Sequence, residues 1–74
     1  MRHLRILRYV DEVARSGSIR RAADKLNITA SALNRRIQDF ELELGTPVFE
    51  RLPRGVRLNA AGELLIRHVR GQLA

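Results

Sequence analysis

Residues 18–44 have the sequence SIRRAADKLNITASALNRRIQDFELEL, in which two helical patterns are separated by a short interruption. Apolar side chains recur at helical spacing over residues 18–26 and again over residues 30–44. Between them, residues 27–29 are Asn-Ile-Thr, where asparagine tolerates positive φ and threonine is a good N-cap. This part of the chain is therefore predicted to form a short helix and a longer helix joined by a tight turn.

The helix expected over residues 30–44 has two different faces. Its apolar positions follow the helical period and form one stripe: Leu33, Ile37, Phe40 and Leu44. Short polar, amide and guanidinium side chains form another face: Ser31, Asn34, Arg35 and Gln38. Such a helix can be held by its apolar stripe while the other face contacts base edges in a DNA major groove. An ordinary solvent-exposed helix face contains the same residue types, so this pattern alone leaves both interpretations open.

Further elements are expected on both sides of this helix pair. Their predicted ranges are a helix at 4–15, a helix from 60 towards 74, and short strands at 48–49 and 56–58. Gly17 can end the first helix, residues 52–55 form the turn between the strands, and Asn59 caps the last helix. The order α-α-α-β-β-α predicts a mainly α fold with a two-stranded β wing, which is a winged helix-turn-helix.

The charge of the chain points to a polyanionic partner. Its 14 lysine and arginine residues outnumber the 8 acidic residues, which gives a formal net charge of +6. Of these basic residues 13 are arginine, whose planar fork of donors matches phosphates and guanine edges. A field of this sign favours polyanions through steering and counterion release. Charge alone leaves acidic proteins, anionic lipids, RNA and DNA open as partners.

Three arginines fall within the predicted hairpin: Arg51, Arg54 and Arg57. Pro53 and Arg54 form a narrow tip, which could place a guanidinium group beside a DNA minor groove, where negative potential attracts it. For Arg51 and Arg57, phosphate contacts and ion pairs within the domain are equally compatible with the sequence. Arginines near turns can also serve only to keep a protein soluble, so the hairpin does not identify a nucleic acid by itself.

The composition excludes several classes of protein. The chain has no cysteine, and its histidines and carboxylates lack metal-ligand spacing, so no disulfide, metal site or cofactor is expected. His3 and His68 lie far apart, and no glycine-rich phosphate loop or nucleophile elbow is present, so no enzymatic activity is expected. The longest aliphatic run, Leu64–Ile66, is too short to span a membrane, and the N-terminus lacks the apolar block of a signal peptide. A cytoplasmic location is the default expectation.

The residues described so far also resemble a known family. The similarity is carried by residues 17–29 (GSIRRAADKLNIT), 32–37 (ALNRRI), Glu41, 44–51 (LGTPVFER) and 56–62 (VRLNAAG). Together they resemble the N-terminal winged helix-turn-helix of LysR-type transcriptional regulators over nearly the whole chain. The resemblance implies a bacterial DNA-binding domain that dimerises and recognises interrupted inverted repeats near promoters.

This resemblance and the residue chemistry together assign candidate DNA contacts. Helix 30–44 would lie in the major groove, with the base-reading residues Ala30, Ser31, Asn34, Arg35 and Gln38. Contacts to the DNA backbone are assigned to Ser18, Arg20, Thr29, Arg36 and Arg51. The wing, residues 49–58, would place Pro53 and Arg54 beside the minor groove. Residues 1–58 would form the DNA-binding domain.

Residues 59–74 would be the start of the family's linker and dimerisation helix. The predicted dimer seam consists of Leu65, Ile66, Val69 and Leu73. The same stripe could also pack on the first helix, against Tyr9 and Val10, so the homodimer of this chain is expected to be weak. Family members usually continue into a ligand-sensing domain, and a small-molecule effector is expected only if such a domain follows. No membrane partner is expected.

Four positions depart from the common pattern of the family. Many members have glutamine at the position of Ala30, serine at Asn34, serine or threonine at Arg20, and threonine at Asn59. Asn59 still provides a helix cap. Ala30 cannot hydrogen-bond a base edge, although its methyl group can touch a thymine methyl. The base preferences of relatives therefore do not transfer to this chain.

The sequence leaves three other binding functions open. Molybdate-responsive regulators have a similar winged domain with a different sensor downstream. A winged-helix protein-interaction module would use Leu65, Val69 and Leu73 to bind a partner protein and would not bind DNA. An RNA-binding domain is disfavoured, because stacking platforms are scarce: the chain has one tyrosine and two phenylalanines, and both Phe40 and Phe49 are expected to be buried.

Overall fold

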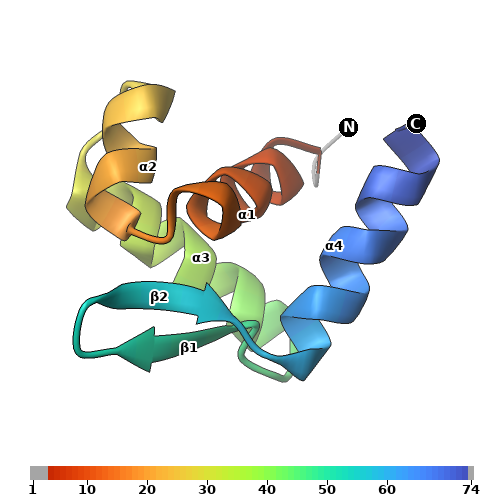
Figure 1. Cartoon of the computed structure of the whole chain (residues 1–74). Coiled ribbons are helices and arrows are strands. Elements are labelled where there is room, and N and C mark those ends of the chain that lie inside the picture. Colours follow the sequence, from red (N-terminus) through yellow and green to blue (C-terminus); the bar gives the residue numbers. More distant parts are fainter. Residues whose placement is uncertain (1–3, 74) are drawn as a thin grey trace.

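The computed structural model describes residues 4–73, which form four helices and one two-stranded sheet (Figure 1). The elements are α1 (Leu4–Ser16), α2 (Ile19–Leu26), α3 (Ala30–Leu44), β1 (Phe49–Leu52), β2 (Gly55–Leu58) and α4 (Ala60–Leu73). This is the predicted order α-α-α-β-β-α, so the winged helix-turn-helix class is confirmed. None of the helices between residues 4 and 73 is both long and apolar enough to cross a membrane.

Local hydrogen bonds define the starts of α2 and α3, and the turn between these helices depends on Asn27. Ser18 Oγ accepts a hydrogen bond from the backbone N–H of Arg21 at 3.2 Å, which caps the start of α2. Thr29 Oγ1 accepts one from the backbone N–H of Ala32 at 3.1 Å, which caps the start of α3. Between them, Asn27 ends α2 in the left-handed conformation with a φ of 60°. The predicted caps are therefore confirmed, and they fix where the two helices begin.

One hydrophobic core joins the helices to the sheet. Its buried side chains come from every element or from the residue next to it: Val10, Val13, Ala22, Ala23, Leu33, Ile37, Phe40, Val48, Phe49, Val56 and Ile66. The predicted stripe of α3 is confirmed at three positions, but its fourth member, Leu44, is 45% exposed. Leu44 is the last residue of α3 and is not among the side chains that pack against the core. The stripe prediction was therefore wrong only at the C-terminal end of the helix.

The wing is an antiparallel hairpin whose strands are longer than predicted. The strands pair in the register Phe49↔Leu58, Glu50↔Arg57, Arg51↔Val56 and Leu52↔Gly55. The expected strands at 48–49 and 56–58 and the turn at 52–55 are corrected, because only Pro53 and Arg54 lie outside the ladder. Charged side chains interrupt the hydrophobic pattern of these strands. Glu50 and Arg57 nevertheless face each other as an ion pair, which favours the pairing.

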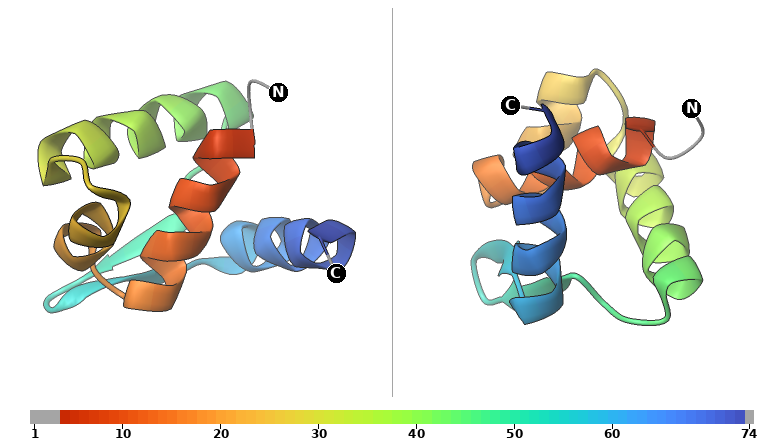
Figure 2. Two further views of the ribbon diagram at one scale, coloured as in Figure 1. Left: turned by 90° about the horizontal axis from the view of Figure 1, so that it is seen from above. Right: turned by 90° about the vertical axis from the view of Figure 1, so that its right-hand side faces the viewer.

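The start of α3 and the tip of the wing lie on the same side of the molecule, as Figure 1 and the left view of Figure 2 both show. α2 lies next to them on this side. α4 projects from the other side of the molecule, where it packs against α1. The elements to which DNA contacts were assigned from the sequence therefore share one side, and α4 leads away from it.

Candidate nucleic-acid interface

The N-terminal part of α3 presents a polar face to solvent. The predicted base-reading residues follow one side of the helix, with Ala30, Ser31, Arg35 and Gln38 exposed and Asn34 half-buried. On its inner side the helix is held by Leu33 and Ile37, both of which are fully buried. The helix is thus fixed by one face while the other remains open. The residues are placed as contact with base edges requires, and the contacts themselves remain a prediction.

Three of the predicted backbone contacts, Ser18, Arg20 and Thr29, lie at the starts of α2 and α3. Ser18 precedes α2 and Thr29 precedes α3, and each uses its side-chain oxygen as a cap. Thr29 Oγ1 also lies 3.4 Å from Ser31 Oγ, a contact in which either hydroxyl could donate. Arg20 and Arg36 are exposed on the helices that follow these caps. Because a helix start carries partial positive charge, the two hydroxyls and Arg20 suit phosphate oxygens, whereas Arg36 lies further along α3.

Two of the predicted contact residues hydrogen-bond to each other. Arg51 on β1 donates a hydrogen bond from Nη2 to Oδ1 of Asn34 on α3, over a distance of 2.8 Å. The contact connects the wing to the exposed face of α3, although 17 positions separate the two residues in the sequence. The sequence is compatible with two roles for Arg51, a contact with a phosphate or an ion pair within the domain. The structure provides a partner within the domain, an amide oxygen rather than a carboxylate.

The two other wing arginines have different surroundings. Arg57 forms an ion pair with Glu50 at 2.9 Å, and this hydrogen bond lowers the pKa of the Glu50 carboxyl below its usual value. Of the two interpretations left open for Arg57, the structure therefore shows the ion pair. Arg54 is exposed beside Pro53 at the tip of the wing. A guanidinium group in that position can reach an adjacent minor groove without breaking a contact seen in the part of the chain described.

Uncompensated positive charge is present on the elements of this side. Five exposed arginines of α2, α3 and the wing tip have no carboxylate within ion-pair distance in residues 4–73: Arg20, Arg21, Arg35, Arg36 and Arg54. By contrast, Arg15 and Arg70 pair with an acidic residue on α1. The positive potential of this surface attracts polyanions, and salt screens the attraction.

The wing is attached to the turn between α1 and α2 by its backbone. The N–H of Val56 donates a hydrogen bond to the carbonyl oxygen of Gly17 at 3.1 Å. Gly55 has a φ of 101°, and a Cβ atom at this residue would lie 2.3 Å from the same oxygen. Only glycine fits this approach. This attachment of the hairpin is therefore made by backbone atoms alone.

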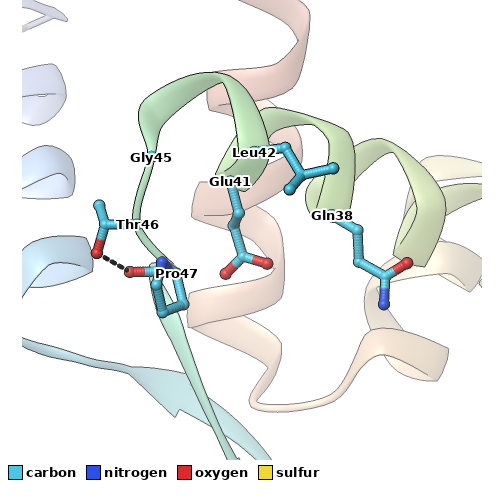
Figure 3. Close-up of a pocket in the computed structure, with 6 residues that line it drawn as sticks. All are labelled: Gln38, Glu41, Leu42, Gly45, Thr46 and Pro47. Atoms are coloured by element: carbon cyan, nitrogen blue, oxygen red, sulfur yellow. Dashed lines mark hydrogen bonds between the residues drawn. The ribbon is translucent and has the colours of Figure 1, made fainter.

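A second attachment of the wing, missed from the sequence, comes from Glu41 on α3. Its Oε2 accepts hydrogen bonds from the backbone N–H groups of Val48 at 2.7 Å and Phe49 at 3.3 Å. An open hollow at this end of α3 is lined by Gln38, Glu41, Leu42, Gly45, Thr46 and Pro47 (Figure 3). One feature of the sequence could have indicated this tether. Glu41 follows the buried Ile37 by one helical turn and so borders the apolar stripe of α3. A carboxylate in such a place needs hydrogen-bond partners.

On α4, the predicted dimer seam is only partly available. Leu65 and Val69 are half-buried, whereas Ile66 is 2% exposed and belongs to the core. The assignment of Ile66 to the seam is therefore corrected, because its side chain is already covered within the domain. Leu73 ends α4, and its side chain lies outside the described part of the structure. Leu64, which the sequence pattern did not single out, is 66% exposed.

α4 is attached to the rest of the domain near both of its ends. At its start, Gly62 packs so closely that a Cβ there would lie 2.1 Å from the carbonyl oxygen of Val48. Near its other end, Arg70 donates to Asp11 on α1 at 2.8 Å, and Arg15 donates to the same carboxylate at 2.9 Å. Partial burial raises the pKa of Asp11, but the hydrogen bonds from the two arginines outweigh burial, so the pKa lies below its usual value.

Comparison with known sequences identifies similar proteins. A family model described as bacterial regulatory helix-turn-helix protein, lysR family, matches residues 4–63. The transcriptional regulator BudR of Klebsiella aerogenes is 50% identical over 60 residues, which cover 81% of this chain and 42% of BudR. The regulator CbbR of Rhodospirillum rubrum is 41% identical over 73 residues, which cover 99% of this chain and 24% of CbbR. The chain thus spans less than half the length of these curated relatives.

Solved structures show the same architecture. The BenM DNA-binding domain in complex with catB site 1 DNA has a TM-score of 0.87 and 38% identity, covering 95% of this chain and 75% of that one. The CbnR DNA-binding domain in complex with DNA has a TM-score of 0.85 and 35% identity, covering 93% of this chain and 79% of that one. Both similar structures are DNA-binding domains with DNA present.

Proposed function

The chain belongs to the lysR family of bacterial regulatory helix-turn-helix proteins, and on this basis we propose that it binds double-stranded DNA sequence-specifically as part of a transcriptional regulator. The observation that carries the proposal is that the exposed face of α3 starts on the same side as the arginine tip of the wing. A helix and a wing placed in this way can contact adjacent grooves of one duplex. The role is binding rather than catalysis, and a regulator of bacterial promoters acts in the cytoplasm.

The proposed docking places the N-terminal half of α3 in the major groove. Arg35 is the strongest candidate for a guanine contact, because its exposed guanidinium can donate two hydrogen bonds to one base. The other proposed base contacts are Ala30, Ser31, Asn34 and Gln38, and the proposed backbone contacts are Ser18, Arg20, Thr29, Arg36 and Arg51. Pro53 and Arg54 would lie beside the minor groove.

The proposed regulator functions as a dimer on an inverted repeat. Residues 1–58 would form the DNA-binding domain, and residues 59–74 would begin the linker helix that pairs two subunits. Leu65 and Val69 are half-buried against their own domain, which supports a weak homodimer for this chain by itself. A small-molecule effector belongs to the proposal only for a longer protein with a sensor domain, since the matched relatives are more than twice as long as the matched region.

Selection of bound duplexes from a random pool tests the proposal. At low salt, we expect the chain to enrich a defined half-site, with strong positions opposite α3 and weaker positions beside the wing. If the selected pool keeps its random composition while binding still occurs, the chain binds DNA without specificity. If no duplex is retarded at low salt, DNA binding itself is contradicted, and a protein-interaction module becomes the better interpretation.

The electrostatic part of the proposal has its own test. If about five phosphates are neutralised per protomer, the logarithm of the binding constant should fall with the logarithm of salt concentration with a slope of about −4.5. Titrations of one selected duplex between low and moderate ionic strength measure this slope. An affinity that does not change with salt would exclude the arginine surface as the DNA-binding surface.

A further inference from the structure

The hydrogen bond between the wing and α3 has a consequence for base selectivity. Resting on the DNA-binding function above, we propose that Arg51 is a positioning residue that orients the Asn34 amide, so that Asn34 presents hydrogen-bond donors to DNA and prefers guanine to adenine. Arg51 Nη2 lies 2.8 Å from Asn34 Oδ1. Asn34 occupies the middle of the exposed face of α3, next to Arg35 and one helical turn from Gln38.

The orientation of the amide follows from the chemistry of its partner. A guanidinium nitrogen can only donate a hydrogen bond, and of the two ends of an amide only the oxygen can accept one. The Asn34 oxygen therefore points to Arg51, and its NH₂ group is turned away from the wing. Asn34 is half-buried, and the hydrogen bonds described for it give its NH₂ group no partner within residues 4–73.

An amide held in this way is poorly suited to read adenine in the usual manner. Bidentate recognition of adenine needs the amide oxygen to accept from N6 while the NH₂ group donates to N7. In this protein the oxygen is engaged by a cation, which also disfavours the approach of a second donor. The remaining NH₂ group has two donors, and guanine presents two acceptors, N7 and O6, on its major-groove edge. The base that faces Asn34 on the contacted DNA strand should therefore be guanine.

Arg51 can keep this contact while the domain is bound to DNA. A guanidinium group has five N–H donors, and one of them is used by Asn34, so the others can still reach a phosphate oxygen. Loss of Arg51 would then have two separable effects. Loss of a phosphate contact weakens binding to all duplexes equally, whereas release of the Asn34 amide changes the ratio between guanine and adenine duplexes.

The experiment compares this ratio between variants of the whole chain. Duplexes are first selected from a random pool, and the base pair facing Asn34 is the one whose preference is lost in Asn34→Ala. Dissociation constants are then measured for the guanine and adenine duplexes at that pair. We expect the unmodified chain to prefer guanine by about tenfold, and Arg51→Ala to bring the ratio to about one or below. In the Asn34→Ala background, Arg51→Ala should leave the ratio unchanged.

A matched control is available on β2, the strand of the wing that pairs with β1. Arg57→Ala removes the same charge from the wing without touching Asn34, so it should weaken both duplexes by the same factor. Arg51→Met keeps the aliphatic stem and serves as a second variant in case Arg51→Ala does not fold.

Three results would overturn the inference: an adenine preference at this pair, a ratio unaffected by either Arg51 variant, or no base preference lost in Asn34→Ala. Failure to select any duplex would instead contradict the DNA-binding function itself.

Discussion

The carboxylate of Glu41 accepts a hydrogen bond from the backbone N–H of Val48 at 2.7 Å, which connects the last turn of α3 to the start of the wing. Val48 is 1% exposed, so its backbone has little access to water. The same oxygen of Glu41 also accepts from the next N–H along the chain, at 3.3 Å. One side chain thus satisfies two donors that would otherwise remain unpaired where the chain enters β1.

Removal of this acceptor should destabilise the domain. We expect Glu41→Ala to lower the free energy of unfolding by about 1–3 kcal/mol, because an unsatisfied buried donor carries a desolvation penalty. Glu41→Gln keeps a carbonyl acceptor and should lose less. Urea denaturation followed by circular dichroism measures both variants. Glu43→Ala, an exposed change on the same helix, is the control, and a similar loss in Glu43→Ala would show that removal of a carboxylate from this end of α3, rather than loss of the tether, is responsible.

Two glycines of α4 should respond to alanine in opposite directions. At Gly62, a Cβ atom would lie 2.1 Å from the Val48 carbonyl oxygen, so Gly62→Ala should cost about 1–3 kcal/mol despite the better helix propensity of alanine. At Gly71, nothing lies within 4 Å of such a Cβ, so Gly71→Ala should stabilise by up to about 1 kcal/mol. Thermal unfolding of the two variants tests the prediction. Equal shifts in Tm would contradict the close contact at Gly62.

The ion pairs of Asp11 should make stability depend on acid pH. Because the folded-state pKa of Asp11 is lowered, its contribution is fully present above the unfolded-state pKa and is lost as pH falls through the folded-state pKa. We expect Asp11→Asn to cost about 0.5–1 kcal/mol at neutral pH and low salt, a difference that disappears in acid. Urea denaturation at neutral pH and at acid pH measures this difference in the free energy of unfolding, with the exposed Asp39→Asn as control. A difference that is constant with pH would exclude the charge as its source.

Substitution of Arg35 should reduce both affinity and selectivity. If its guanidinium contacts a guanine, Arg35→Ala should cost about 1–3 kcal/mol on the selected half-site and relax the preference at one position. Arg67→Ala, which removes an exposed arginine from α4, is the matched control for charge. Binding isotherms on the selected duplex and on single-base variants of it separate the two effects. An equal loss on all duplexes would reassign Arg35 to a phosphate.

Self-association should depend on Leu64, an exposed apolar side chain on α4. We expect the chain to form a weak dimer, and Leu64→Glu to weaken it at least about tenfold, because burial of one leucine side chain contributes about 1.5–3 kcal/mol. Leu42→Glu is the matched control, since Leu42 is 79% exposed on α3. Sedimentation equilibrium measures both variants. A tight dimer at low micromolar concentration would contradict the expectation of weak association, and equal effects of the two variants would exclude α4 as its surface.

Local signals allowed most of the fold to be predicted. Helix ends depend on neighbouring residues, so the caps of Ser18 and Thr29 and the left-handed Gly17 and Asn27 could be recognised from sequence. Asn59 likewise accepts the N–H of Gly62 at 2.9 Å and starts α4 where expected. These signals require no knowledge of the remaining chain.

Apart from the bounds of the two wing strands, the features that the sequence did not predict depend on how separate elements pack together. Leu44 is exposed because no core side chain packs against it at the end of α3, and Ile66 is buried because α4 packs back on the domain. The hydrogen bond between Arg51 and Asn34 and the tether from Glu41 require the position of the wing relative to α3. Helical or strand periodicity does not contain this information, so a candidate site can be located from sequence before its internal contacts are known.

The backbone contact between Val56 and Gly17 restricts how far the wing can move relative to the helices. If α3 and the wing tip contact adjacent grooves as proposed, part of any mismatch in their spacing would be absorbed by bending or narrowing of the duplex. Stiff A-tracts and flexible pyrimidine–purine steps differ in the energy of such deformation. In the proposed complex, base pairs that no side chain touches would therefore contribute to the choice of duplex.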